Sequence, residues 1–73
     1  MPPELLSIAM VRRLAANGSA RAIREAAGLS ISEVARDLGV TPSAVSRWER
    51  GLRRPHGQPA TDYLKILEGL SGR

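Results

Sequence analysis

The 73-residue sequence contains no cysteine and no phenylalanine, and it has one tryptophan, one tyrosine and one histidine. Without cysteine there can be neither disulfides nor thiolate zinc sites, and His56 alone cannot form a histidine-based metal site. Because aromatic residues are scarce, a core must be assembled from Leu, Ile, Val, Ala and Met, which favours helices over a β-sandwich. No apolar run approaches the ~20 residues of a membrane span, and Pro2-Pro3-Glu4 lacks the basic start of a signal peptide. We therefore expect a cytoplasmic protein.

The chain also lacks the parts of an enzyme. A single domain spanning residues 1–73 buries only ~60% of its unfolded surface, which leaves little room for a catalytic cleft. There is no nucleophilic thiol and no Gly-rich phosphate loop, and the acids are expected on solvated helix faces. We expect no catalytic residues, no cofactor, no metal and no small-molecule ligand.

Negative charge is in the minority. The formal net charge is +4 and the pI is about 11.1, and arginine supplies nearly all of the positive charge. Its planar, forked donor suits phosphates and guanine edges. Basic composition is nevertheless common among small proteins, and abundant arginine can reflect a GC-rich genome, so the assignment depends on where the arginines lie.

Glycine and proline divide the chain into helical segments. The breaks fall at Asn17-Gly18-Ser19, Gly28, Gly39, Gly51 and Pro55-His56-Gly57. We predict helices at about 3–16, 19–27, 31–38, 42–50 and 59–69. The fold class is all-α, a compact bundle of about five short helices, with an extra N-terminal helix in 1–18, a core in 19–55 and a C-terminal helix in 56–73.

Two helix starts are strongly marked. Ser30 followed by Glu33 is a capping box, in which each side chain bonds the backbone amide of the other residue. Thr41 suits an N-cap and Pro42 suits the first helical position. Between them, Gly39 lies where a tight turn requires a positive φ. These signals predict two short helices joined by a tight turn, a helix-turn-helix at 31–50.

The apolar pattern of this unit has one inward side. Residues three or four apart share a helix face, and small Ala35 allows the two helices to cross closely, with Val40 filling the corner. The inward side is predicted to comprise Val34, Ala35, Leu38, Val45 and Trp48.

The other side of the second helix is polar and free of acids. Ser43, Ser46, Arg47 and Arg50 follow i, i+3, i+4, i+7 spacing. Arg47 has the donors to bind guanine O6 and N7, and the serines can bond a base or a phosphate. A solvated helix face is the alternative, but the position of this stripe on the second helix favours a DNA-reading role.

A basic loop follows the second helix. Residues 47–54 contain four arginines and one acid, a balance that suits the DNA backbone, although a solubilising loop is the alternative. The amides at the start of the first motif helix are a further phosphate site through the helix dipole. The predicted phosphate contacts are Ser30, Ile31, Thr41, Arg50, Arg53 and Arg54.

Glu49 is an acid beside a surface proposed for DNA. It lies next to Trp48 and one turn from Val45, so we expect it to turn toward the body of the domain. Arg24 in the preceding helix is its expected partner, and a buried pair would fix the recognition helix in place.

From Arg21 to about Leu70 the chain resembles the phage repressor and Cro family of helix-turn-helix proteins, the XRE-like group. The resemblance is strongest in "LSISEVARDLGVTPSAVSRWERGLRRP" and "YLKILEGL". It implies double-stranded DNA as partner, in a bacterial or phage-infected cell, and an Arg–Glu ion pair at Arg24 and Glu49. It places Pro42, Ser43, Ser46 and Arg47 at the bases, and Arg50, Arg53 and Arg54 at phosphates.

This chain departs from the family where glutamine is common, at Ile31 and Pro42. Ile31 could meet a thymine methyl, a sugar or nothing, so the base preference cannot be inherited. The family's final dimer-forming helix is also expected to be missing. Dimers of the family match half-sites about one DNA turn apart, whereas a monomer would bind one half-site more weakly.

The N-terminal segment is apolar around most of its circumference, so we expect burial on more than one side. It either serves as core filler or offers its second side to a second copy or another protein. The residues in question are Leu5, Leu6, Ile8, Met10, Val11 and Leu14.

Three functions fit these features. The first is a transcriptional regulator, such as a phage or prophage Cro-like or repressor-like protein. The second is an antitoxin or adaptor that binds a partner protein through the N-terminal helix and autoregulates on DNA. The third is an accessory DNA-architecture or excision factor. Sequence alone specifies neither the operator nor the direction of regulation.

Overall fold

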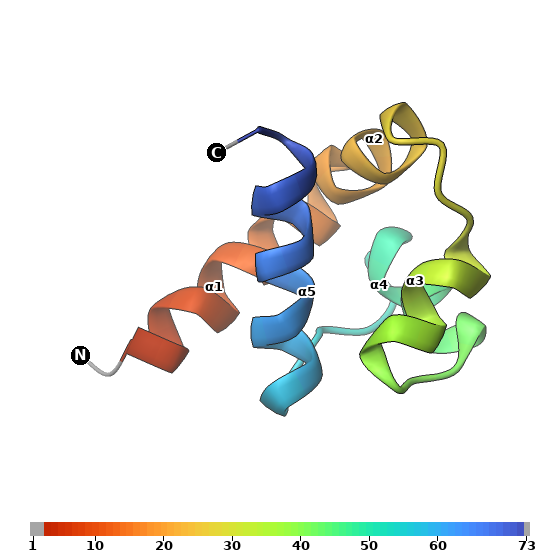
Figure 1. Cartoon of the computed structure of the whole chain (residues 1–73). Coiled ribbons are helices and arrows are strands. Elements are labelled where there is room, and N and C mark those ends of the chain that lie inside the picture. Colours follow the sequence, from red (N-terminus) through yellow and green to blue (C-terminus); the bar gives the residue numbers. More distant parts are fainter. Residues whose placement is uncertain (1–2, 73) are drawn as a thin grey trace.

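A computed structural model describes residues 3–72 and contains only helices in that range. The all-α fold with an extra N-terminal helix is confirmed. The helices are α1 (Pro3–Ala16), α2 (Ser19–Ala26), α3 (Ile31–Leu38), α4 (Pro42–Glu49) and α5 (Gly57–Leu70). In Figure 1, α1 and α5 cross on one side of the molecule, while α3 and α4 form the other side.

The marked helix starts are present as capping structures. The Glu33 amide donates to Ser30 Oγ over 3.0 Å, and the Ser30 amide donates to the Glu33 carboxylate over 2.9 Å. The Ala44 amide donates to Thr41 Oγ1 over 3.1 Å, and Pro42 occupies the first turn of α4. Local hydrogen bonding therefore sets where both motif helices begin.

α5 begins two residues earlier than the predicted position 59. Pro59 lies in the first turn of α5. Proline is tolerated there because a backbone amide in the first turn has no partner within the helix, so the loss of that amide costs little. The Gln58 side chain reinforces this turn by donating to Thr61 Oγ1 and to Asp62 Oδ1.

Gly39 closes α3 in the left-handed region, at φ 71° and ψ 29°. We expect Gly39→Ala to lower the free energy of unfolding by about 1–2 kcal/mol, because an L side chain strains this backbone conformation. A Cβ there would meet no atom within 4 Å, so the loss is conformational. Each kcal/mol corresponds to a fall of about 4–8 °C in Tm for a domain of this size.

Gly69→Ala is the matched control, because Gly69 lies within α5 and its Cβ would also meet open space. Alanine is the better helix former, so this change is expected to stabilise the protein by up to about 1 kcal/mol. Thermal melts of both variants that shift in the same direction would contradict the assigned backbone conformation.

The core lies where α1 and α5 meet the inward side of the helix-turn-helix. Trp48 packs against Tyr63 of α5, with ring centroids 5.4 Å apart and planes inclined by 35°. The whole predicted inward side is buried, and the apolar core comprises Val11, Ala15, Ala20, Val34, Ala35, Leu38, Val45, Trp48, Ala60, Tyr63, Leu64 and Leu67.

α1 is buried on one side by residues 3–72, and burial of its second side would need a second copy or another protein. Val11 is fully buried, and Ile8 and Leu14 pack partly against the core. Leu5, Leu6 and Met10 remain 50%, 55% and 48% exposed. The packed side meets α5, α2 and α4, and no element of residues 3–72 covers the other side.

Tyr63 is completely buried, and no group within residues 3–72 hydrogen-bonds its hydroxyl. Burial, with a smaller effect from the Glu49 charge, raises the pKa of Tyr63 from 10.0 to about 12. The folded chain thus binds this proton more tightly than the unfolded chain. The resulting stability is fully present below pH 10 and is lost as the pH rises toward 12.

We therefore expect Tyr63→Phe to increase the free energy of unfolding by about 1 kcal/mol, because an unsatisfied buried hydroxyl is removed while the ring is kept. Denaturant titrations at neutral pH and at pH 10–12 measure both effects. The wild type should lose stability over the alkaline range more steeply than the variant. Equal pH dependence of the two proteins would show that Tyr63 ionises freely in the folded state.

Candidate nucleic-acid interface

A groove of about 360 Å³ lies between the start of α3 and the outer side of α4. It brings Ile31 of α3 close to Pro42 of α4, the two positions where this chain departs from the expected glutamines. No acid lines it, and its residues are Ile31, Ser32, Pro42, Ser43, Ser46, Arg47 and Arg50.

The outer side of α4 is accessible. Ser43, Arg47 and Arg50 are exposed, while Ser46 is half-buried at the floor of the groove. Val45 and Trp48, on the inner side, are buried. No ion pair within residues 3–72 involves Arg47 or Arg50, so both guanidinium groups are free. The groove therefore presents guanidinium donors that a ligand could engage.

The arginine loop, residues 50–55, continues this basic surface. The amides of Leu52 and Arg53 both donate to the Arg47 carbonyl, over 2.9 and 3.3 Å, so the loop turns back on the end of α4. Arg50, Arg53 and Arg54 are exposed. The loop thus holds its cations at the end of the helix that carries Arg47.

A second groove, of about 290 Å³, lies on the other flank of α4 and was not predicted from the sequence. Its apolar floor includes Trp48 and Pro59, and Arg47, Arg53, Arg54 and His56 also line it. His56 was considered only as an insufficient metal ligand, although its position two residues after Arg54 was a usable signal. The groove extends the basic surface from α4 toward the start of α5.

At the start of α3, the capping box alters the expected phosphate site. The Ser30 amide is already bonded to Glu33. This backbone bond, followed by a bond with the Ser30 hydroxyl, lowers the pKa of Glu33 below its ordinary value of 4.5. At neutral pH the ionised Glu33 carboxylate therefore already accepts the hydrogen bond of the Ser30 amide. An incoming phosphate would meet the amides of Ile31 and Ser32 instead.

Glu49 turns inward, and Arg24 binds it through two hydrogen bonds. Arg24 Nε and Nη2 donate to the two carboxylate oxygens over 2.6 and 3.0 Å. Arg24 Nη1 also donates to the Leu29 carbonyl over 2.8 Å. The hydrogen bond with Glu49 raises the pKa of Arg24, and the two side chains are only 9% and 3% exposed. The pair keeps the acid away from the outer side of α4 and fixes α4 to α2 and to the segment before α3.

The described residues include no cluster of three or more His, Cys, Asp or Glu side chains that could hold a metal ion. None of the helices within residues 3–72 is long and apolar enough to cross a membrane.

Comparison with known proteins identifies a family for most of the chain. A helix-turn-helix family profile matches residues 21–70, which include most of α2 and all of α3, α4 and α5 and exclude α1. No curated protein and no solved structure matches the chain. The family match covers most of the sequence and has the two motif helices at its centre. The chain therefore belongs to the XRE-like, lambda-repressor-like helix-turn-helix family, a family of DNA-binding domains.

Proposed function

We propose that this protein binds double-stranded DNA at specific sequences by placing α4 in the major groove. Its role would be that of a small, non-enzymatic transcriptional regulator of the phage or prophage Cro-like or repressor-like type. The observation that carries this proposal is the exposed, acid-free outer side of α4, whose inner side is anchored by Val45 and Trp48.

Within this proposal the residues divide into two groups. Arg47 binds a guanine edge, and Ser43 and Ser46 bond neighbouring bases or phosphates. Pro42 and Ile31 offer apolar surface, which suits a thymine methyl group. The second group binds phosphates around this centre. It comprises the backbone amides of Ile31 and Ser32, and the residues Thr41, Arg50, Arg53 and Arg54.

Selection of bound duplexes from a random pool tests the proposed function. We expect one preferred sequence, bound at least about 10³-fold more tightly than unrelated DNA at physiological salt. A plot of log affinity against log salt should be linear with a negative slope, because phosphate contacts release counterions. Recovery of unenriched sequences from repeated rounds would contradict sequence-specific binding.

A second candidate function is an antitoxin or adaptor, and the exposed apolar side of α1 favours it. Leu5, Leu6 and Met10 are each about half exposed, so this side of α1 could meet a protein partner or a second copy. Deleting α1 is a poor test, because Val11 and Ala15 belong to the core. Light scattering of wild type and of Leu6→Glu combined with Met10→Glu is the better comparison. A monomer mass for both proteins would exclude a homodimer. Failure of the wild type to bind the protein products of adjacent genes would exclude the antitoxin or adaptor function.

A further inference from the structure

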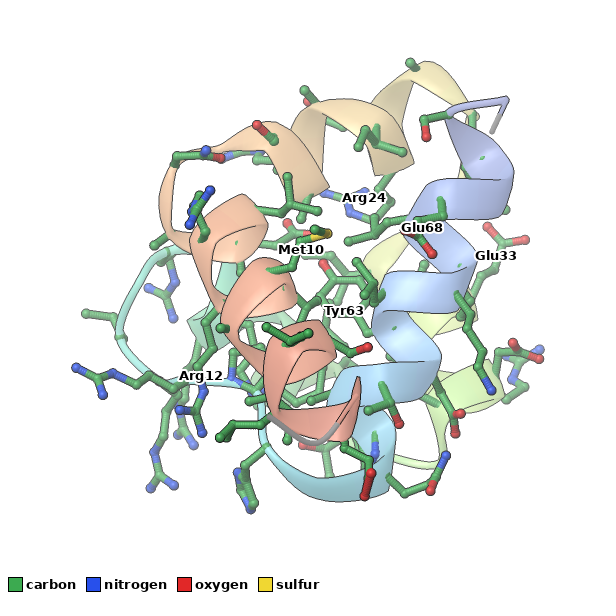
Figure 2. The ribbon with its side chains drawn as sticks, turned by 90° about the vertical axis from the view of Figure 1, so that its left-hand side faces the viewer. Met10, Arg12, Arg24, Glu33, Tyr63 and Glu68 are labelled. Atoms are coloured by element: carbon green, nitrogen blue, oxygen red, sulfur yellow. The ribbon has the colours of Figure 1, made fainter. Side chains whose placement is uncertain are left out.

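α1 is joined to the arginine loop by one side chain, although α1 lies outside the residues that match the family. Arg12 Nε donates to the Pro55 carbonyl over 2.8 Å, across 43 positions of sequence. Figure 2 shows Arg12 on the side of α1 that faces this loop. The N-terminal helix thus contacts the segment that carries Arg53 and Arg54.

The loop is held at two points, and Arg12 contributes to the second. At its start, the amides of Leu52 and Arg53 bond the Arg47 carbonyl. At its end, Pro55 has a fully buried side chain, and proline has no amide to donate. The carbonyl of Pro55 can still accept, and Arg12 donates to it over 2.8 Å. The other side-chain contact with the backbone at this end is longer, 3.5 Å between His56 Nδ1 and the Arg54 carbonyl.

The positive charge of Arg12 is not taken up by an acid among the described residues. No salt bridge within residues 3–72 involves Arg12. Its cation lies instead against a loop that carries Arg53 and Arg54. Positive charge gathered on one segment favours the binding of an anion such as a DNA phosphate there.

We propose that Arg12 is a positioning residue for DNA binding, which holds the Pro55 end of the arginine loop so that Arg53 and Arg54 face the phosphate backbone. The extra helix α1 is then a working part of the DNA-binding surface as well as a part of the core. This inference rests on the proposed function. It predicts that loss of the Arg12 hydrogen bond weakens DNA binding through the loop.

The test compares Arg12→Met with Arg13→Met on the selected duplex. Each change removes one positive charge from α1 and keeps an unbranched apolar stem, but the Arg13 side chain is exposed and makes no hydrogen bond within residues 3–72. We expect Arg12→Met to weaken binding about 2- to 10-fold, the value of one hydrogen bond. Arg13→Met should bind nearly as well as wild type, and Arg12→Lys, which retains a donor, should recover most of the loss. Equal losses of affinity for Arg12→Met and Arg13→Met would show that the lost net charge, and not the hydrogen bond to Pro55, weakens binding, which would overturn the proposal.

A double-mutant cycle separates positioning from direct contact. In a background of Arg53→Ala and Arg54→Ala, Arg12→Met should cause no further loss of affinity, because the residues that it positions are absent. The same fold loss in both backgrounds would show that Arg12 acts independently of the loop and would overturn the proposal.

Backbone ¹⁵N relaxation of the free protein tests the same contact without DNA. The amides of Arg53, Arg54 and His56 should become more mobile in Arg12→Met and remain unchanged in Arg13→Met. Unchanged loop order in Arg12→Met would overturn the proposal even if the protein binds DNA. Failure of the wild type to bind any duplex would instead remove the proposed function, while this measurement would still report on the anchor.

Discussion

Arg47→Ala is expected to weaken binding to the preferred duplex by about 1–3 kcal/mol, or roughly 5- to 150-fold, and to affect unrelated duplexes much less. Arg47 is exposed on the outer side of α4 and lines both grooves. Its guanidinium has two parallel donors for guanine O6 and N7, and alanine has none. Titrations of the variant with the selected duplex and with substitutions at each position measure the loss and locate the base.

Arg53→Ala and Arg36→Ala are the matched controls for this experiment. Arg53 lies in the arginine loop, so its loss should weaken binding to all duplexes similarly and reduce the salt slope by about 1. Arg36 is exposed on α3 and lines neither groove, so its replacement should change little. If Arg47→Ala lowered affinity equally for every sequence, Arg47 would be a phosphate contact and base reading would belong elsewhere.

Glu49→Gln is expected to lower the free energy of unfolding by about 3–5 kcal/mol, because the buried Arg24 cation would lose its counter-charge. A small domain has little stability to spare, so the variant should be largely unfolded at moderate temperature. The Arg24 guanidinium donates two hydrogen bonds to Glu49 and one to the Leu29 carbonyl. All three bonds depend on the position of this guanidinium. Denaturant titration followed by far-UV circular dichroism measures the loss.

The double variant Arg24→Met with Glu49→Met distinguishes an unpaired charge from poor packing. Replacing both charges by apolar groups of similar length is often neutral or stabilising, so the double variant should be markedly more stable than Glu49→Gln. DNA binding by the double variant would then show whether the ion pair also positions α4. If the double variant is as unstable as the single one, packing around the pair accounts for the loss.

The helices and the exposed side of α4 were predictable because their causes are local. Ser30 with Glu33, Thr41 with Pro42, and Gly39 each act within one turn of chain. The 3.6-residue period then determines which residues of a helix share a face. The acid Glu49 was also informative, because a charge beside apolar Trp48 needs a partner.

The remaining features depend on contacts between distant segments. The bond from Arg12 to Pro55 and the second groove with His56 exist only once α1, α4 and α5 have packed together. The side of α1 that stays exposed was equally unpredictable. Leu5, Leu6 and Met10 are as apolar as Val11, and the positions of α5, α2 and α4 determine which of these side chains is covered.

The most direct test of the account is a map of amide chemical-shift changes when the ¹⁵N-labelled protein binds its selected duplex. The largest changes should fall on Ser43, Ser46 and Arg47, with further changes in the arginine loop and at Ile31 and Ser32. The groove that Met10, Ile23 and Leu64 line between α1, α2 and α5 should change little. The largest changes in that groove, with α4 unaffected, would show that DNA does not meet the outer side of α4.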